Sequence, residues 1–235
     1  MSAEVATALK STRGLKGIFS TSVGKKAVVA VTGLGLTAFL VVHLLGNLQF
    51  FLGPEPFNNY AHTIKSLPVI LWGARIGLLL FFVTHISLAI QLKRQNFAAR
   101  PVRYAFENTV QATASSRSML ISGSIILIYA IYHIAHFTLG VTHPQHFQLT
   151  DTHGNHDVYQ MVKLGFLDTK VAIFYIASMA ALAFHLSHGF ASVFQTLGLS
   201  NPKQNCGLRK LACALAGFLF VGFSSIPFYV MFFLK

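Results

Sequence analysis

Four histidines lie inside long apolar stretches of the chain, and this placement constrains the fold more than any other feature. They are His43, His85, His133 and His185. A helix of about 20 apolar residues spans the roughly 30 Å hydrocarbon core of a bilayer. Five stretches are long enough, at residues 27–52, 67–92, 118–141, 170–198 and 211–234. The sequence therefore predicts an all-α integral membrane fold, a bundle of five transmembrane helices.

The composition agrees with a membrane protein. Of the 235 residues, 54% are hydrophobic and 10% are charged, and the mean hydropathy is +0.59. An ordinary soluble domain is less apolar and carries about 25% charged residues. The sequence has no phosphate-binding glycine loop, dinucleotide fingerprint or nucleophile motif, so any organic substrate chemistry is expected on a partner subunit.

The net charge of +12 falls mostly on one side of the expected bundle. Basic residues precede the first span, link the second to the third and link the fourth to the fifth: Lys10, Arg13, Lys16, Lys25, Lys26, Lys93, Arg94, Arg100, Arg103, Arg117, Lys203, Arg209 and Lys210. The positive-inside rule then places the N-terminus in the cytoplasm and the C-terminus outside. The expected location is a bacterial inner (cytoplasmic) membrane. Residues 1–26 are expected to form a cytoplasmic arm, and a nucleic-acid partner is not expected.

The depths of the four histidines predict two haem sites. A histidine in hydrocarbon usually faces the bundle interior, and imidazole is a common axial ligand of haem iron. The helical rise of about 1.5 Å per residue places His43 and His133 in the outer half of the membrane, and His85 and His185 in the inner half. Each pair is expected to hold one haem b, in layers about 15 Å apart. Residues 27–235 are therefore interpreted as a di-haem transmembrane domain.

Other residues are secondary candidates for cofactor contacts. His136 and His188 each follow a ligand candidate by three residues, on roughly the same helix face, so only one histidine of each pair is expected to bind iron. Candidate partners for haem propionates, at or near span ends, are Arg75, Lys93, Arg94 and Arg117.

The two segments on the outer side, between the first and second spans and between the third and fourth spans, are expected to be loops. Gly53 to Tyr60 has turn chemistry, and the segment between the third and fourth spans is polar. The second segment holds four histidines, namely His143, His146, His153 and His156. Metal capture there is an alternative, but solvated loop histidines are the favoured interpretation because their spacing is not diagnostic.

Several motifs resemble one family of membrane cytochromes. They are Val42-His43-Leu44-Leu45-Gly46-Asn47, Phe57-Asn58-Asn59-Tyr60-Ala61-His62, Ser66-Leu67-Pro68, Thr84-His85, Ser122-Gly123, Tyr132-His133 and Phe184-His185-Leu186-Ser187-His188-Gly189. With these motifs the chain resembles the cytochrome b membrane anchor of succinate dehydrogenase and fumarate reductase, of the single-chain, five-helix, di-haem type. The resemblance covers nearly all of residues 20–235.

This resemblance implies an electron-transfer subunit of a respiratory enzyme. It places the haem ligands at His43, His85, His133 and His185, with His136 and His188 as fallback ligands. It implies a flavoprotein with FAD and an iron-sulfur subunit on the cytoplasmic side, with the dicarboxylate chemistry on the flavoprotein. It also implies a membrane quinone, menaquinone being favoured over ubiquinone, and a dimer of whole complexes.

The expected quinone contacts lie in the first outer segment. His62, Glu55 and Asn58 are the candidates, with His62 favoured as the proton acceptor. Some relatives carry a carboxylate where this chain has Lys65, which puts transmembrane proton coupling in question.

Three alternatives remain open. The first is a cytochrome b anchor of a hydrogenase or formate dehydrogenase, against which the Phe-Asn-Asn motif argues. The second is a lipid desaturase with a di-iron site, which needs about eight histidines near one face. The third is a histidine-relay transporter without haem, for which an intramembrane carboxylate is expected.

Overall fold

The structure is a computed structural model that describes residues 20–99, 114–201, 203 and 205–234. Most of the expected cytoplasmic arm, including Lys10, Arg13 and Lys16, lies outside these residues, as do Arg100 and Arg103. Within the described ranges the chain is helical and has no β-strand, apart from one isolated bridge between Thr150 and His156. The all-α prediction is therefore confirmed for this part of the chain.

Within the described residues, five helices are long and apolar enough to cross a membrane, as expected. They are α3 (Ser22–Leu48, extended by the 3-10 turn η1, Gln49–Leu52), α5 (Pro68–Ala98), α7 (Met119–His133, extended by the π-helix η2, Ile134–Thr138), α10 (Thr169–Thr196) and α11 (Asn205–Phe233). The short helix α6 (Ala114–Arg117) precedes α7. Local capping sets two of the starts, because Thr21 accepts a hydrogen bond from the Gly24 amide and Asp168 accepts one from the Lys170 amide.

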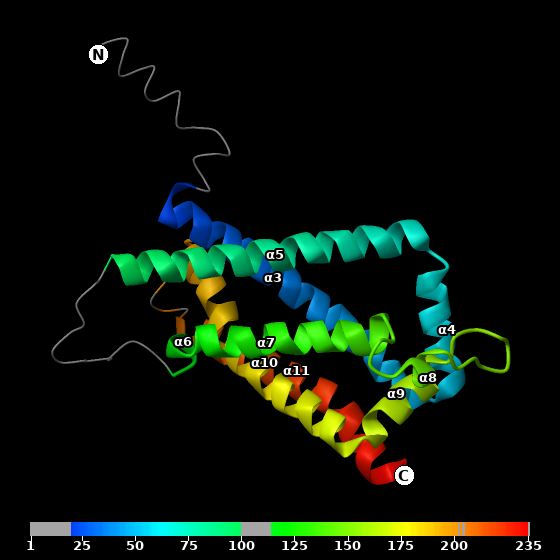
Figure 1. The fold of residues 1–235 in the computed structure, drawn as a ribbon. Coiled ribbons are helices and arrows are strands. Elements are labelled where there is room, and N and C mark those ends of the chain that lie inside the picture. The colour runs from blue at the N-terminus through cyan, green and yellow to red at the C-terminus, as the bar shows by residue number, and fades with distance from the viewer. Residues whose placement is uncertain (1–19, 100–113, 202, 204, 235) are drawn as a thin grey trace, which may run out of the picture.

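The two outer segments are not simple loops, which corrects the expectation. The first forms α4 (Pro54–Lys65), and the second forms α8 (Pro144–Phe147) and α9 (Val158–Leu167). Pro54 can begin α4 because a residue in the first helical turn has no intrahelical partner for its N–H group, and proline lacks that group. The preceding residue, Gly53, adopts a positive φ of 102°, which glycine tolerates and which turns the chain into the helix. Asp157 caps α9 by accepting a hydrogen bond from the Gln160 amide at 3.0 Å. These helices gather at the end of the bundle that also holds the C-terminus (Figure 1).

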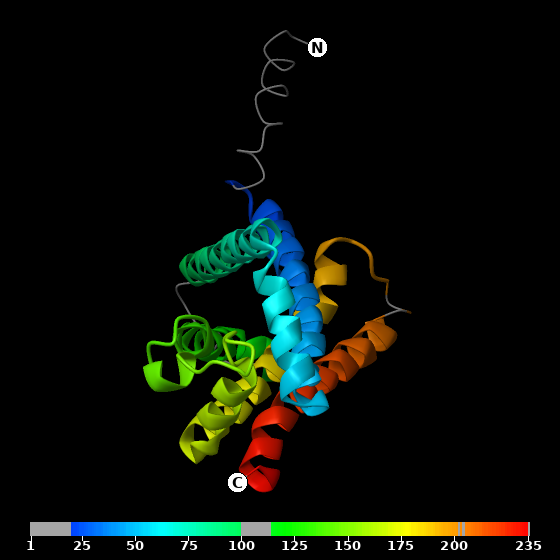
Figure 2. The same cartoon turned by 90° about the vertical axis from the view of Figure 1, so that its right-hand side faces the viewer.

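The bundle has an uneven interior. Helices α10 and α11 pack along each other, and α5 packs chiefly on α3. Figures 1 and 2 show α3 crossing between α5 and the α10–α11 pair. One core cluster centres on Leu44, Met179, Leu182 and Leu219, whereas α5 buries only Leu88 among its 31 residues. The faces of α5 turned away from α3 are thus not covered by the described residues.

Close helix contact in the central core depends on a glycine of α11. A Cβ atom at Gly222 would lie 2.6 Å from the Cδ2 atom of Leu44, whose side chain on α3 is fully buried. Small residues allow membrane helices to approach in this way. The α3–α11 contact therefore requires a residue without a side chain at this position.

We expect Gly222→Ala to lower the free energy of unfolding by about 1–3 kcal/mol, because the added methyl group overpacks Leu44. Gly217→Ala on the same helix is the matched control, since a Cβ there meets no neighbouring side chain within 4 Å. Thermal unfolding of the purified chain in detergent compares the two variants. Equal unfolding temperatures would show that the contact is not close.

Candidate functional site

The outer histidine pair joins α3 and α7. The ring centroids of His43 and His133 lie 5.9 Å apart, and the ring planes are nearly perpendicular, at 83°. Within the described residues neither imidazole forms a hydrogen bond, and the Nδ1 atom of His133 is buried without a partner. An imidazole nitrogen binds a metal at about 2 Å, so two rings on opposite sides of one metal have centroids roughly 6 Å apart. The pair fits that separation.

Aromatic rings enclose the outer pair. Phe39 stacks on His43 at 5.2 Å and Phe223 lies 5.8 Å from the same ring, measured between centroids. Around His133 the neighbouring rings are those of Tyr129, Phe137 and Tyr175, at 5.6, 5.9 and 6.0 Å. These side chains give the two imidazoles a largely apolar setting, in which unpaired ring nitrogens are costly.

The inner histidine of α5 has a defined orientation. The Nδ1 atom of His85 lies 3.1 Å from the carbonyl oxygen of Val29 and 3.2 Å from Oγ1 of Thr32, both on α3. Since a carbonyl oxygen only accepts, the His85 Nδ1 atom carries the proton and donates it. The Nε2 atom then keeps its lone pair, as required of a metal ligand.

The inner histidine of α10 is oriented in the same way. The Nδ1 atom of His185 lies 3.0 Å from Oγ of Ser122 on α7. The Ser122 hydroxyl also lies 3.1 Å from the carbonyl oxygen of Ser118, and when it donates there its oxygen can accept the proton of His185 Nδ1. Each inner candidate is thus oriented at Nδ1 by a neighbouring helix, and within the described residues neither Nε2 atom has a hydrogen-bond partner.

The second histidine of each His-x-x-His pair has other contacts. His136 is 2% exposed, its Nδ1 atom lies 3.1 Å from the Tyr175 hydroxyl, and its Nε2 atom packs against Gly165 of α9. The Nε2 atom of His188 lies 3.2 Å from the Ser192 hydroxyl on its own helix. The hydroxyl contact of His188 favours His185 in the α10 pair. In the α7 pair the Nε2 atom of His136, like the Nδ1 atom of His133, is buried without a hydrogen-bond partner, so these contacts do not separate the two histidines.

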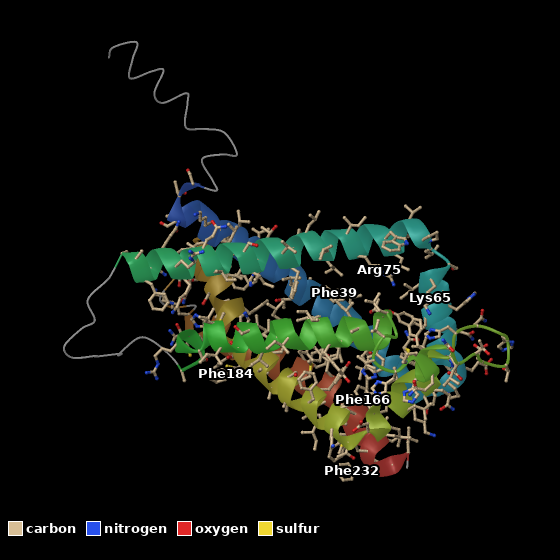
Figure 3. The ribbon with its side chains drawn as sticks, in the orientation of Figure 1. Phe39, Lys65, Arg75, Phe166, Phe184 and Phe232 are labelled. Atoms are coloured by element: carbon tan, nitrogen blue, oxygen red, sulfur yellow. The ribbon has the colours of Figure 1, made fainter. Side chains whose placement is uncertain are left out.

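All four cationic candidates are exposed. They are Arg75, Lys93, Arg94 and Arg117. The Arg75 guanidinium lies over the Trp72 ring at 5.1 Å, and the Lys93 ammonium over the Phe97 ring at 4.7 Å. Arg75 lies toward the same end of the molecule as Lys65 (Figure 3), near the N-terminal end of α5, while Lys93 and Arg94 lie near the C-terminal end of the same helix.

The three expected quinone contacts differ from one another. Asn58 is buried, donates to Asp157 Oδ1 at 3.0 Å and accepts from the Tyr159 amide at 2.9 Å. Its amide therefore joins α4 to α9. Glu55 and His62 are exposed, and within the described residues their side chains form no hydrogen bond or ion pair.

A pair of basic side chains at the outer surface was not foreseen. The Lys65 Nζ atom lies 2.7 Å from the Nδ1 atom of His156, across 91 residues of chain. Partial burial and the charge of Arg75 hold the pKa of Lys65 below its ordinary value. Burial and the charge of Lys65 likewise lower the pKa of His156. The ammonium donates to a neutral imidazole, because only a neutral ring nitrogen can accept.

The other outer histidines do not form a metal centre. Among the described residues no group of three or more His, Cys, Asp or Glu side chains is placed to hold a metal ion. His143 and His146 stack at 5.1 Å between ring centroids, and both are partly buried. Of the four histidines in this segment, His153 is exposed and the other three are partly buried.

We expect Lys65→Gln to raise the pKa of His156, because the substitution removes the positive charge that disfavours a second one. Burial remains, so the value should stay below that of a free histidine. A ¹⁵N-histidine NMR titration in lipid nanodiscs measures the shift, with Lys163→Gln on α9 as the control. An unchanged or lower pKa in Lys65→Gln would show that the two side chains are not paired.

Comparisons with protein-family models, with curated proteins and with solved structures find no match for this chain.

Proposed function

We propose that this chain is the cytochrome b membrane anchor of a succinate:quinone oxidoreductase, with two bis-histidine b haems. His43 and His133 would hold the outer haem, and His85 and His185 the inner one. The observation that carries the proposal is the hydrogen bonding of His85 and His185. Each ring is held at Nδ1 by an oxygen of a neighbouring helix, which leaves a lone pair on Nε2 inside an apolar bundle.

The residues present fit a haem at each level. At the outer level His133 has a buried, unpartnered nitrogen, and the two rings have a separation suited to one shared iron. At the inner level both rings are oriented at Nδ1, and Gly33 leaves room for the His85 ring, because a Cβ there would lie 3.1 Å from Cε1. Both donor sets consist of neutral imidazoles, the usual axial ligands of b haems.

When bound, the two haems would supply one-electron chemistry between a soluble dehydrogenase and the membrane quinone. The side chains of this chain would bind the haems, orient the ligand rings and shield them from water. The Thr32 and Ser122 hydroxyls hold the inner rings, and the aromatic wall around His43 and His133 excludes water from the outer pair. Arg75 is available for an outer propionate, and Lys93, Arg94 and Arg117 for inner propionates.

The partners follow from the charge distribution and the family resemblance. The basic cytoplasmic face would dock an iron-sulfur subunit and a flavoprotein, in a bacterial inner membrane with the N-terminus inside. Quinone would bind near the outer end, where Lys65 and His156 offer a proton-exchanging pair beside the exposed His62. None of the five spans contains Asp or Glu, which disfavours the transporter alternative.

The pairing of the ligands is the sharpest test of this function. We expect His43→Ala and His133→Ala to lose the same haem, and His85→Ala and His185→Ala to lose the other, because each iron needs both of its histidines. Reduced-minus-oxidised optical spectra and redox titrations of the purified variants identify which haem remains.

The double variant His43→Ala/His133→Ala is the control for this pairing. It should retain as much haem as either single variant, whereas His43→Ala/His85→Ala should retain none. Loss of a different haem from each member of a pair would contradict the assignment.

We expect Cys206 to react with a membrane-impermeant maleimide only in inverted membrane vesicles, because the basic α10–α11 segment should face the cytoplasm. The test uses Cys213→Ser, which leaves Cys206 as the sole, exposed thiol. His153→Cys in a Cys206→Ser/Cys213→Ser background is the control and should react only in intact cells. The reverse pattern would contradict the orientation.

A further inference from the structure

Helices α3 and α7 share a pattern of three residues. A hydroxyl residue and a glycine stand in Thr32-Gly33 and in Ser122-Gly123, and each dipeptide is followed on the same helix by a candidate outer ligand, His43 or His133. The hydroxyl residue and the histidine are 11 positions apart in both helices, which is close to three helical turns. They therefore share one helix face, roughly 16 Å apart along the axis.

The two hydroxyl groups make matching contacts. Thr32 donates to the carbonyl oxygen of Val28 at 2.8 Å, and Ser122 donates to that of Ser118 at 3.1 Å, four residues back in each case. With its own proton used, each oxygen accepts the Nδ1 proton of a histidine on a neighbouring helix, His85 at 3.2 Å or His185 at 3.0 Å.

The adjacent glycines lie beside the histidine rings but differ in how tightly. A Cβ atom at Gly33 would lie 3.1 Å from Cε1 of His85, so the ring would have to shift by a few tenths of an ångström. A Cβ atom at Gly123 would lie 3.5 Å from Cε1 of His185, which is ordinary van der Waals contact. The match between the two dipeptides therefore rests on their hydroxyl groups, and only Gly33 is needed to make room for a ring.

We propose that Thr32 and Ser122 are matched positioning residues, which hold the Nδ1 protons of His85 and His185 and so present the Nε2 atoms of both to one iron. In this arrangement α3 and α7 each serve both levels, with a ligand for the outer haem and an orienting hydroxyl for the inner one. The inference rests on the proposed function. It goes beyond that function by naming the residues that set the orientation and the basicity of the two inner ligand imidazoles.

The two positions are not equal in their effect. His85 has a second acceptor, the Val29 carbonyl oxygen at 3.1 Å, whereas Ser122 is the one acceptor of His185 within the described residues. A hydrogen bond from Nδ1 raises the basicity of a ligating imidazole, which favours the oxidised iron. Loss of Ser122 should therefore raise the inner midpoint potential more than loss of Thr32.

The test compares Ser122→Ala and Thr32→Val with two matched controls. Thr37→Val removes an equally buried threonine of α3, 5% exposed like Thr32, whose hydroxyl donates to the Gly33 carbonyl oxygen. Ser178→Ala removes a serine that is 2% exposed, against 4% for Ser122, and that donates to the Phe174 carbonyl oxygen. Within the described residues neither control hydroxyl forms a hydrogen bond with a histidine.

Redox titration and haem retention of the purified chains are the readouts. We expect Ser122→Ala to raise the inner midpoint potential and to weaken inner haem retention about ten-fold or more, Thr32→Val to do the same to a smaller extent, and Ser122→Thr to restore both. The outer potential should not move, and both controls should match the wild type.

Two failures are distinguishable. A wild-type chain without haem would overturn the proposed function. A wild-type chain with two haems, and a Ser122→Ala variant whose inner potential equals that of Ser178→Ala, would overturn the positioning role alone.

Discussion

Hydrogen bonds between helices, from histidine Nδ1 atoms to oxygens of α3 and α7, are the interaction on which the candidate site depends. A polar nitrogen in an apolar bundle costs free energy unless it is paired. His85 meets this requirement through Val29 and Thr32, and His185 through Ser122. The same bonds set the tautomer, because the donated proton leaves the lone pair on Nε2. Orientation and ligand chemistry therefore have one physical origin.

The outer end of the bundle is organised by polar contacts between short helices. Asn58 of α4 bonds Asp157 and the Tyr159 amide, and Lys65 of α4 bonds His156. These contacts attach α4 to α9 above the level of His43 and His133, where buried aromatic rings such as Phe50 and Phe166 fill the core. The proposed outer haem would thus lie beneath a structured cap, and exchange of protons with quinone would occur at basic side chains instead of a carboxylate.

Much of this arrangement could be predicted from the sequence, because hydropathy and helical rise are local properties. The five spans were predicted from apolar length alone and are confirmed. The depth pairing that joined His43 to His133 agrees with the observed contact of their rings. The expectation of loops is wrong for α4 because Gly53 and Pro54 have turn chemistry in the sequence, although proline also begins helices. It is wrong for α9 because this helix has only 10 residues, too few to stand out as a span, and follows a polar segment.

Contacts between distant residues were beyond this reasoning. A threonine such as Thr32 commonly bonds its own helix backbone, so nothing in the sequence marks it as the acceptor for a histidine 53 residues away. The same holds for Lys65 and His156, which belong to different helices and loops. The repeated spacing of Thr32 to His43 and of Ser122 to His133 was the one signal in the sequence that pointed to these hydroxyl residues. It can be interpreted only when their contacts with His85 and His185 are known.

The most direct measurement of the central claim is the haem content of the purified wild-type chain. A pyridine haemochrome assay gives the haem type, and quantitative amino-acid analysis of the same sample gives the amount of protein. The account predicts two non-covalent b haems per chain, both low-spin because each iron has two imidazole ligands. A chain that folds in the membrane and contains no haem would contradict it.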